Sequence, residues 1–399
     1  MKTYPSKSIP VDSLLTPPAG MPELALEVRK HGERVVEKLL SIFEAKYWLS
    51  FADYMQFCLY DPEVGYYSGG MQKFGPDGDF ITAPEISPLF GQCVAEALAP
   101  LLKKHPDWSI CELGPGRGVL AESILLHLDM LNALPKSYQL LEVSANLRHQ
   151  QSERLHKLDL GCEIQHLDKP PEQFRGIILG NEVLDALVVE RFYFDSVGYD
   201  LQCCIGMEKN KLVELTKFAP EPLRHTIGEI PNIPKYNYTS EICLQLPAWL
   251  KSISSGMLEG ILLFADYGFS QSEYYSPERS DGTLRCHYRQ HAHNNYLALP
   301  GLQDLTAWVN FTQLGEAALA LDLDVVAYTT QAHFLLGSGH LQTLDLNKLD
   351  EKCRYQTSRE IQTLTLPANM GESFRFMQLN KNCDIIIPAM QLRDLRHQL

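Results

Sequence analysis

Short apolar segments alternate with amphipathic stretches through the middle of the chain. The apolar segments suit buried strands and are predicted at residues 109–113, 138–143, 162–166 and 176–180. Later segments at 188–194, 260–265 and 324–328 resemble a completion of the same sheet. Short apolar strands separated by helices form parallel sheets that are covered on both faces. We therefore predict a doubly wound α/β core, which binds ligands at the carboxyl ends of its strands.

The segments before this core have a different pattern. Residues 1–20 contain four prolines and predict an extended arm, whereas residues 22–49 have the spacing of one or two amphipathic helices. Residues 51–91 are rich in glycine, proline and aromatic residues, as site-lining loops often are. We expect an N-terminal arm (1–20), a helical cap with a site-lining loop (21–105), and a core (106–399) with loop-rich insertions at about 196–240 and 270–301.

Composition narrows the class of partner. The 399 residues carry a formal net charge of −14, which would repel a phosphate backbone, so nucleic acid is not an expected partner. A small molecule or a basic segment of another protein fits an acidic surface better. The ten cysteines form no Cys-x-x-Cys pair, which indicates reduced thiols. Without a signal-peptide pattern or an apolar run of membrane-spanning length, we expect a bacterial-type cytoplasmic protein with no membrane span.

The strongest motif is a glycine-rich turn between a predicted strand and a predicted helix. It reads Glu112-Leu-Gly114-Pro-Gly116-Arg-Gly118, and such a turn lets the backbone approach a nucleotide-like cofactor at a helix N-terminus. The third glycine comes one position too early for a nicotinamide dinucleotide fingerprint. Glu142 ends the next predicted strand, where a carboxylate can accept hydrogen bonds from ribose hydroxyls. A plain strand-to-helix connection is the alternative for the turn alone.

A second group of polar residues follows the strand at 176–180. Asn181, Glu182 and Asp185 stand where a ligand crevice is expected, and two carboxylates there could bind a planar cation such as a guanidinium. A helix start, with Asn181 as its N-cap, explains the same residues equally well.

Three further polar segments could border a site. Asp77, Asp79, Thr82, Glu85 and Ser87 form a cluster that we interpret as partly a site wall and partly turns, with Ser87 capping the next helix. The segment at 285–293 is rich in histidine but has no recognised zinc spacing, so we predict no metal site and expect a polar lid or a helix. Residues 266–268 could contact a ligand or form a simple turn.

With these residues identified, the chain resembles the MidA family of methyltransferases. The resemblance covers about residues 51–336 and rests on DYMQFCLYDPEVGYY, GDFITAPEISPLFG, ELGPGRG, GNEVLDAL, DYG, GTLRCHYRQH, PGLQDLT and TTQAHFL. It departs from the family pattern at Val188, where proline is usual, and at Asn310, where aspartate is common.

The resemblance implies a class I methyltransferase (Rossmann-like) fold with S-adenosylmethionine as the methyl donor. It also implies a protein substrate methylated at an arginine nitrogen, because mitochondrial family members are arginine methyltransferases that assist assembly of respiratory complex I. The implied cofactor set is Glu112, Gly114, Gly116, Gly118, Glu142, Asp79, Thr82 and Asn181, and the implied catalytic acids are Glu182, Asp185 and Glu85. A cofactor-binding assembly chaperone that transfers nothing is the alternative, and a nicotinamide-dependent oxidoreductase is disfavoured by the glycine spacing.

Overall fold

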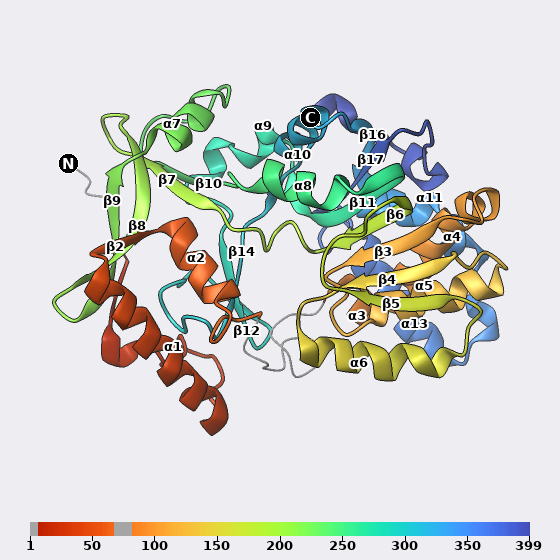
Figure 1. Ribbon diagram of the computed structural model, residues 1–399, viewed down its shortest axis with the longest axis horizontal. Coiled ribbons are helices and arrows are strands. Elements are labelled where there is room, and N and C mark those ends of the chain that lie inside the picture. Colours follow the sequence, from red (N-terminus) through yellow and green to blue (C-terminus); the bar gives the residue numbers. More distant parts are fainter. Residues whose placement is uncertain (1–6, 68–81) are drawn as a thin grey trace. The chain divides into compact units, whose positions relative to one another are not determined.

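The computed structural model describes residues 7–67 and 82–399, which form two compact units. The first unit combines Met1–Ile81, Ala186–Gln245 and Gln271–Trp308, and the second combines Thr82–Asp185, Leu246–Ser270 and Val309–Leu399. Figure 1 shows the helices and strands of both units. Asp77, Asp79 and Phe80 of the predicted site-lining loop lie outside the described residues.

An eight-stranded sheet forms the centre of the second unit. Its strands follow the order β16-β17-β11-β6-β3-β4-β5, and a short β15 pairs with β11. Their bounds are Ser109–Leu113 (β3), Ser137–Leu141 (β4), Glu163–Leu167 (β5), Phe174–Asn181 (β6), Met257–Phe269 (β11), Val309–Asn310 (β15), Asp324–Thr330 (β16) and Phe374–Lys381 (β17).

The strand order confirms the predicted doubly wound α/β fold. Counted from β3, the parallel strands run 3-2-1-4-5, so the chain changes direction across the sheet between β3 and β6 (Figure 1). That switch point is where open α/β sheets place their ligand crevice. One strand of this sheet, β17, was not predicted from the sequence, and it lies antiparallel between β11 and β16.

Helices cover both faces of this sheet. Because side chains alternate along a strand, Ile177, Leu179 and Leu263 share one face and join the apolar cluster that includes α4 and α5. Phe264 points to the other face, where its ring lies 5.9 Å from that of Trp249 in α8. The helices of the unit are Ala83–Ile86 (α3), Pro88–Lys104 (α4), Val119–Met130 (α5), Ala145–Leu155 (α6), Leu246–Ser254 (α8), Phe311–Leu319 (α10), Gln331–Gly337 (α11), His340–Thr343 (α12) and Glu351–Thr365 (α13).

Two glycines allow the central strands to pair closely. Gly176 on β6 lies beside Ser109 of β3 and Gly260 of β11. A Cβ on Gly176 would lie 2.0 Å from the Ser109 carbonyl oxygen, and one on Gly260 would lie 1.9 Å from the Gly176 carbonyl oxygen. Both positions have φ above +140°, a conformation that only glycine adopts readily.

Antiparallel strands dominate the first unit. One sheet follows the order β1-β9-β8-β7-β10 with β2 paired to β8, and a smaller sheet follows β13-β12-β14. The strands are Ser8–Pro10 (β1), Trp48–Ser50 (β2), Glu190–Phe194 (β7), Asp200–Glu208 (β8), Lys211–Phe218 (β9), Tyr238–Ile242 (β10), Arg285–Tyr288 (β12), His291–His293 (β13) and Asp304–Thr306 (β14). The helices are Leu26–Ala45 (α1), Phe51–Tyr60 (α2), Glu221–Gly228 (α7) and Gln271–Tyr274 (α9).

Several expected features of the core belong to this first unit instead. The strand expected at 188–194 pairs antiparallel with β8 and β10 and does not join the large sheet. The insertion expected to be loop-rich at about 196–240 contains the long hairpin β8–β9 and the helix α7, and the histidine-rich segment forms strands β12 and β13 rather than a helix. The units also divide the chain differently from the expected boundary near 106, because Thr82–Lys104 pack within the second unit.

A buried ion network holds strands of the first unit together. The Arg191 guanidinium donates from Nη1 to Glu214 at 2.9 Å and from Nε to Glu241 at 3.2 Å. All three side chains are at most 4% exposed. Glu241 also accepts the backbone N–H of Thr283 at 2.8 Å, so the GTLRCHYRQH segment attaches to the sheet through this acid. Charges this deeply buried need such mutual pairing.

Within residues 7–67 and 82–399, no helix combines the length and the apolar character that crossing a bilayer requires.

Candidate functional site

The glycine-rich turn lies where the sequence predicts it, between β3 and α5. Gly114, Gly116 and Gly118 have φ values of 57°, 53° and 78°, so each residue adopts the left-handed conformation that favours glycine. Around Gly116, a Cβ would meet none of the described atoms within 4 Å, whereas at Gly114 it would lie 3.1 Å from Cγ1 of Val183. The turn therefore exposes backbone beside open space at Gly116 and packs closely at Gly114.

Glu112 lies in β3 and is buried, with 3% of its surface exposed. Its Oε2 accepts a hydrogen bond of 2.7 Å from the Tyr138 hydroxyl on the adjacent strand. Burial raises the pKa of Glu112 to about 7, although the hydrogen bond from Tyr138 acts in the opposite direction. The structure thus buries the acid of the motif in a central strand of the sheet, next to the glycine-rich turn.

Glu142 follows β4 directly and takes part in a network that reaches the glycine-rich turn. Its Oε1 accepts the backbone N–H of Ser144 at 2.8 Å. Gln151, which is fully buried on α6, donates from Nε2 to the Gly116 carbonyl at 2.7 Å and lies 3.5 Å from Glu142 Oε2. His166 Nε2 is 2.8 Å from Gln151 Oε1. Gln151 therefore fixes the turn relative to the carboxylate, a role that the sequence analysis did not predict.

The acid-rich segment after β6 does not begin a helix, so the N-cap interpretation of Asn181 is wrong. Asn181 ends β6, and Glu182 adopts a left-handed conformation with φ of +52°. The carboxylate of Asp266 on β11 holds the loop by accepting three backbone N–H groups, those of Val183 at 3.1 Å, Leu184 at 2.8 Å and Asp185 at 3.3 Å. With the side chain acting as acceptor, the loop needs no helical hydrogen bonds.

The carboxylates of Glu182, Asp185 and Asp266 lie close enough to influence one another and the Tyr267 phenol. Burial raises the pKa of Asp266, and the charge of Glu182 raises it further, although the backbone donors oppose both effects. The pKa of Tyr267 is also raised, first by burial and then by the charges of Glu182 and Asp185. Three carboxylates and a phenol thus share one region at the carboxyl ends of β6 and β11.

Two buried acceptors point toward this region. Glu182 Oε1 accepts the backbone N–H of Ala83 at 3.3 Å and the side-chain amide of Asn181 at 3.2 Å. The Asn181 Oδ1 atom is buried and has no hydrogen-bond partner among the described residues. A buried amide oxygen in that state favours a ligand that brings an N–H or O–H donor.

A salt bridge joins the early loop to the glycine-rich turn. Arg117 Nε donates to Glu85 Oε1 at 3.1 Å, and its Nη2 donates to Glu85 Oε2. Thr82 precedes α3, and its carbonyl accepts the Glu85 backbone N–H at 2.9 Å. Ser87 caps α4 as predicted, through the Leu89 backbone N–H. Asp79 is outside the described residues. No sequence pattern indicates Arg117, because its partner Glu85 lies in a different segment.

The described residues of this site fit an S-adenosylmethionine-type ligand. The backbone at Gly116 borders open space, the α5 N-terminus follows the turn, and a buried carbonyl acceptor and several carboxylates surround the switch point. Carboxylates suit a ligand that carries a sulfonium and an ammonium group, whereas they would repel the pyrophosphate of a dinucleotide.

Comparison with known proteins agrees with this chemistry. Residues 89–329 match the family described as "Putative S-adenosyl-L-methionine-dependent methyltransferase". The chain is 28% identical to the zebrafish (Danio rerio) mitochondrial protein arginine methyltransferase NDUFAF7 over 379 residues, 83% of each chain. It is 26% identical over 399 residues to the NDUFAF7 homologue of Drosophila melanogaster, covering 92% of this chain and 89% of that one.

These relatives correct the expected location. Each is named as a mitochondrial protein, which contradicts the expectation of a cytoplasmic protein. That expectation rested on the first residues of the chain, whose composition is a weak guide to targeting.

Solved structures extend the similarity to the whole fold. A Burkholderia thailandensis protein bound to S-adenosyl-homocysteine superposes with a TM-score of 0.88 and 33% identity, covering 95% of this chain and 100% of that one. A native structure from the same organism gives a TM-score of 0.86 and 31% identity, with the same coverage. S-adenosyl-homocysteine is what remains of S-adenosylmethionine after methyl transfer. The chain belongs to this family of S-adenosylmethionine-dependent methyltransferases.

Proposed function

We propose that this methyltransferase transfers the methyl group to an arginine side chain of a partner protein. Curated relatives that cover most of the chain are named protein arginine methyltransferases. A protein arginine presents a planar cation, and the acid-rich loop after β6 offers carboxylates that suit it. Subunits of respiratory complex I are the first acceptors to test, because the MidA-family resemblance implies them.

The observation that carries the proposal is the conformation of Glu182. A left-handed, non-glycine residue is strained by roughly 1–3 kcal/mol, and such strain persists only where the surrounding structure enforces it. Here the Glu182 backbone N–H donates to the Ala265 carbonyl at 2.8 Å, and Asp266 holds the next three N–H groups. We infer that the strain directs the Glu182 carboxylate toward the acceptor.

Charge repulsion among the acids supports a cationic ligand. Burial, and after it the charges of neighbouring carboxylates, raise the pKa of Asp266 and of Tyr267, so the acids of this region repel one another in a poorly solvated place. A guanidinium would relieve that repulsion and would be oriented by bidentate hydrogen bonds. We assign this binding to Glu182 and Asp185, and we assign Asp266 to positioning their loop.

S-adenosylmethionine supplies an electrophilic methyl group when it is bound. Gly114, Gly116 and Gly118 would hold it through the backbone of the turn, Glu142 through its carboxylate and Asn181 through Oδ1. Glu112 and Thr82 would act from the adjoining strand and loop. Glu85, in its ion pair with Arg117, would act as a positioning residue for the turn.

The reaction then depends mainly on alignment. Methylation of a guanidinium nitrogen releases one proton, and a carboxylate hydrogen-bonded to that nitrogen is placed to accept it. Holding the acceptor nitrogen in a fixed orientation provides much of the rate acceleration. The entropic cost of bringing the reactants together is met when they bind, so it no longer adds to the barrier of methyl transfer.

The test separates cofactor binding from transfer. Glu182→Gln and Asp185→Asn keep the side-chain shapes and remove the charges, and Glu153→Gln, at an exposed position on α6, is the matched control. Tritiated S-adenosylmethionine is incubated with purified complex I subunits or with a mitochondrial extract, and the labelled amino acid is identified after acid hydrolysis. Cofactor affinity is measured by calorimetry.

We expect labelled methylarginine with the wild type and the control. Transfer should fall by about 100-fold or more in each acid variant, since aligned charge contributes that much to such reactions, while cofactor affinity changes by less than about twofold. Label in lysine, or undiminished transfer by both acid variants, would refute the acceptor assignment. Tight cofactor binding without transfer to any protein would favour the assembly-chaperone alternative.

A further inference from the structure

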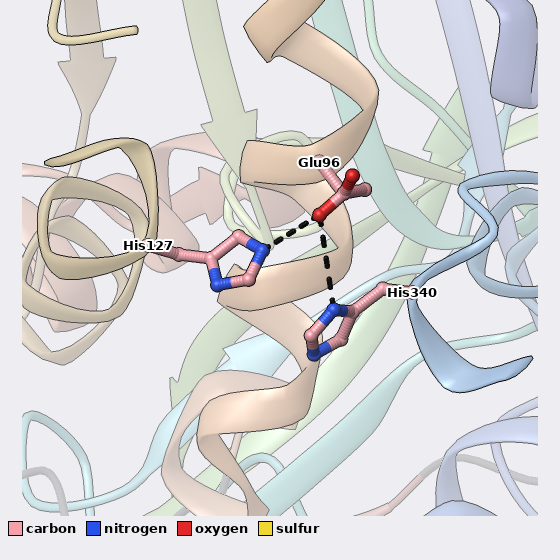
Figure 2. A group of neighbouring side chains, drawn as sticks. All are labelled: Glu96, His127 and His340. Carbon is pink, nitrogen blue, oxygen red and sulfur yellow. Dashed lines mark hydrogen bonds and ion pairs between the residues drawn. The ribbon is translucent and has the colours of Figure 1, made fainter. Parts of the chain in front are cut away.

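Three polar side chains from separate helices of the second unit converge away from the glycine-rich turn. Figure 2 shows Glu96 of α4 between His127 of α5 and His340 of α12. His127 Nε2 lies 2.8 Å from Glu96 Oε2, and His340 Nδ1 lies 3.8 Å from the same oxygen. Among the described residues, this is the group of histidine, cysteine and acid side chains whose ligand atoms all lie within 4.8 Å of one another.

The second nitrogen of His340 has its own partner. His340 Nε2 is 3.0 Å from Gln92 Oε1, one turn before Glu96 on α4. An amide oxygen accepts, so Nε2 carries the proton and the lone pair of His340 lies on Nδ1. In that tautomer the lone pair on Nδ1 lies 3.8 Å from a carboxylate oxygen, and a cation between these two electron-rich atoms would stabilise the contact. A histidine that donates its other N–H to an acceptor is the usual arrangement around a bound metal.

Burial makes the two histidines suitable ligands. Only 8% of His127 and 7% of His340 is exposed, and their rings meet edge to face with centroids 4.6 Å apart. The Glu96 side chain is 32% exposed, so an ion could enter from solvent.

We propose that Glu96, His127 and His340 bind one divalent transition-metal ion, with zinc as the fitting ion and water completing its coordination. Two imidazoles and a carboxylate are ligands that zinc accepts, and ligand atoms around tetrahedral zinc are about 3.3 Å apart. The observed separations of 2.8 and 3.8 Å lie on either side of that value, so small side-chain rotations suffice.

The ion would serve the structure and not the transfer. His127 lies eight residues beyond the start of α5, roughly 12 Å along the helix from the glycine-rich turn at 1.5 Å per residue. The ion would join α12, from the C-terminal part of the chain, to α4 and α5, the helices before and after β3 and its turn. This revises the expectation of no metal, which considered only the histidine-rich segment at 285–293.

The test uses the full-length protein after removal of metal with a chelator. Zinc binding is measured by calorimetry, and cobalt binding by visible absorption, for the wild type and for His127→Ala, His340→Ala and Glu96→Gln. Glu96→Gln keeps the side-chain size and guards against loss of folding, which circular dichroism checks in each variant. The matched control is His149→Ala, because the His149 side chain on α6 is 73% exposed.

We expect one zinc ion per wild-type chain, a higher unfolding temperature with zinc, and a cobalt spectrum without the charge-transfer band of a thiolate. Affinity should fall by at least about tenfold in each of the three ligand variants and stay unchanged in the control. Three results would overturn the proposal: no zinc binding by folded wild type, a thiolate band, or the same affinity in the folded Glu96→Gln variant.

Discussion

Replacing the buried acid Glu112 by glutamine should change how the stability of the second unit depends on pH. Glutamine keeps an oxygen to accept the hydrogen bond that Tyr138 donates at 2.7 Å, but it cannot ionise. The wild-type carboxyl, whose pKa burial raises to about 7, must lose its proton inside the sheet as the pH rises. Comparing Glu112→Gln with the wild type separates the free energy of ionising this carboxyl from the contribution of packing, because the two side chains have nearly the same shape.

The sign follows from where the proton binds more tightly. The carboxyl has a higher pKa in the folded chain than in the unfolded chain, where it is near 4.5. Its stabilising contribution is therefore fully present below about pH 4.5 and is lost as the pH rises through about 7. At about 1.36 kcal/mol per pH unit, the whole difference is about 3 kcal/mol, and most of it falls between pH 5 and pH 8.

Urea unfolding at several pH values between 5 and 8 measures this difference. Tryptophan fluorescence is a suitable signal, because Trp108 is buried directly before β3 and reports on the second unit. The unfolding free energy of the wild type should fall relative to Glu112→Gln by about 2–3 kcal/mol as the pH rises from 5 to 8. Glu153→Gln, at an exposed position, should stay parallel to the wild type. Parallel curves for wild type and Glu112→Gln would refute the reasoning.

Three further predictions concern the site. Gly116→Ala should weaken S-adenosylmethionine binding in calorimetry by tenfold or more. The control is Gly20→Ala, because Gly20 also has a left-handed φ and open surroundings. Both variants should lose about 1–2 kcal/mol of folding stability to backbone strain, but only Gly116→Ala should bind the cofactor more weakly. Equal affinities in both would contradict the role of the turn. Asp266→Ala leaves three backbone N–H groups without their acceptor. It should lower the unfolding free energy by about 3 kcal/mol or more in urea titrations. A loss under about 1 kcal/mol would show that Asp266 does not hold the loop after β6. Arg117→Ala removes the partner of Glu85 and should cost about 1–2 kcal/mol of stability, checked against Glu85→Ala and the double variant, whose costs should not add.

The predicted elements succeed where a signal is local and periodic. The strand–turn–helix around the glycines, the capped helix after Ser87 and the parallel strands up to β6 all have their pattern within a short window. The strand at 190–194 has the same apolar pattern, yet it pairs in another sheet. Apolar periodicity indicates that a strand is buried, but it does not indicate which strand pairs with it.

The residues of the site divide in the same way, into those with a local sequence signal and those placed by long-range contacts. The sequence predicts the glycine-rich turn and the acids Glu142 and Glu182, because strand ends of a doubly wound sheet meet at one edge. It does not predict that Asp266 holds the loop of Glu182 or that Gln151 links the turn to Glu142. Those partners are polar residues with no motif of their own.

The sequence by itself determined the class of fold, the cofactor and the family, since these depend on local turn geometry, residue type and short motifs. Tertiary structure alone decided the division into two units, the reversed strand β17, and the meeting of Glu96 with His127 and His340. The physical reason is the distance along the chain between contacting residues. A hydrogen bond or a ligand cluster between distant segments depends on how the whole chain packs, and no short stretch of sequence contains that information.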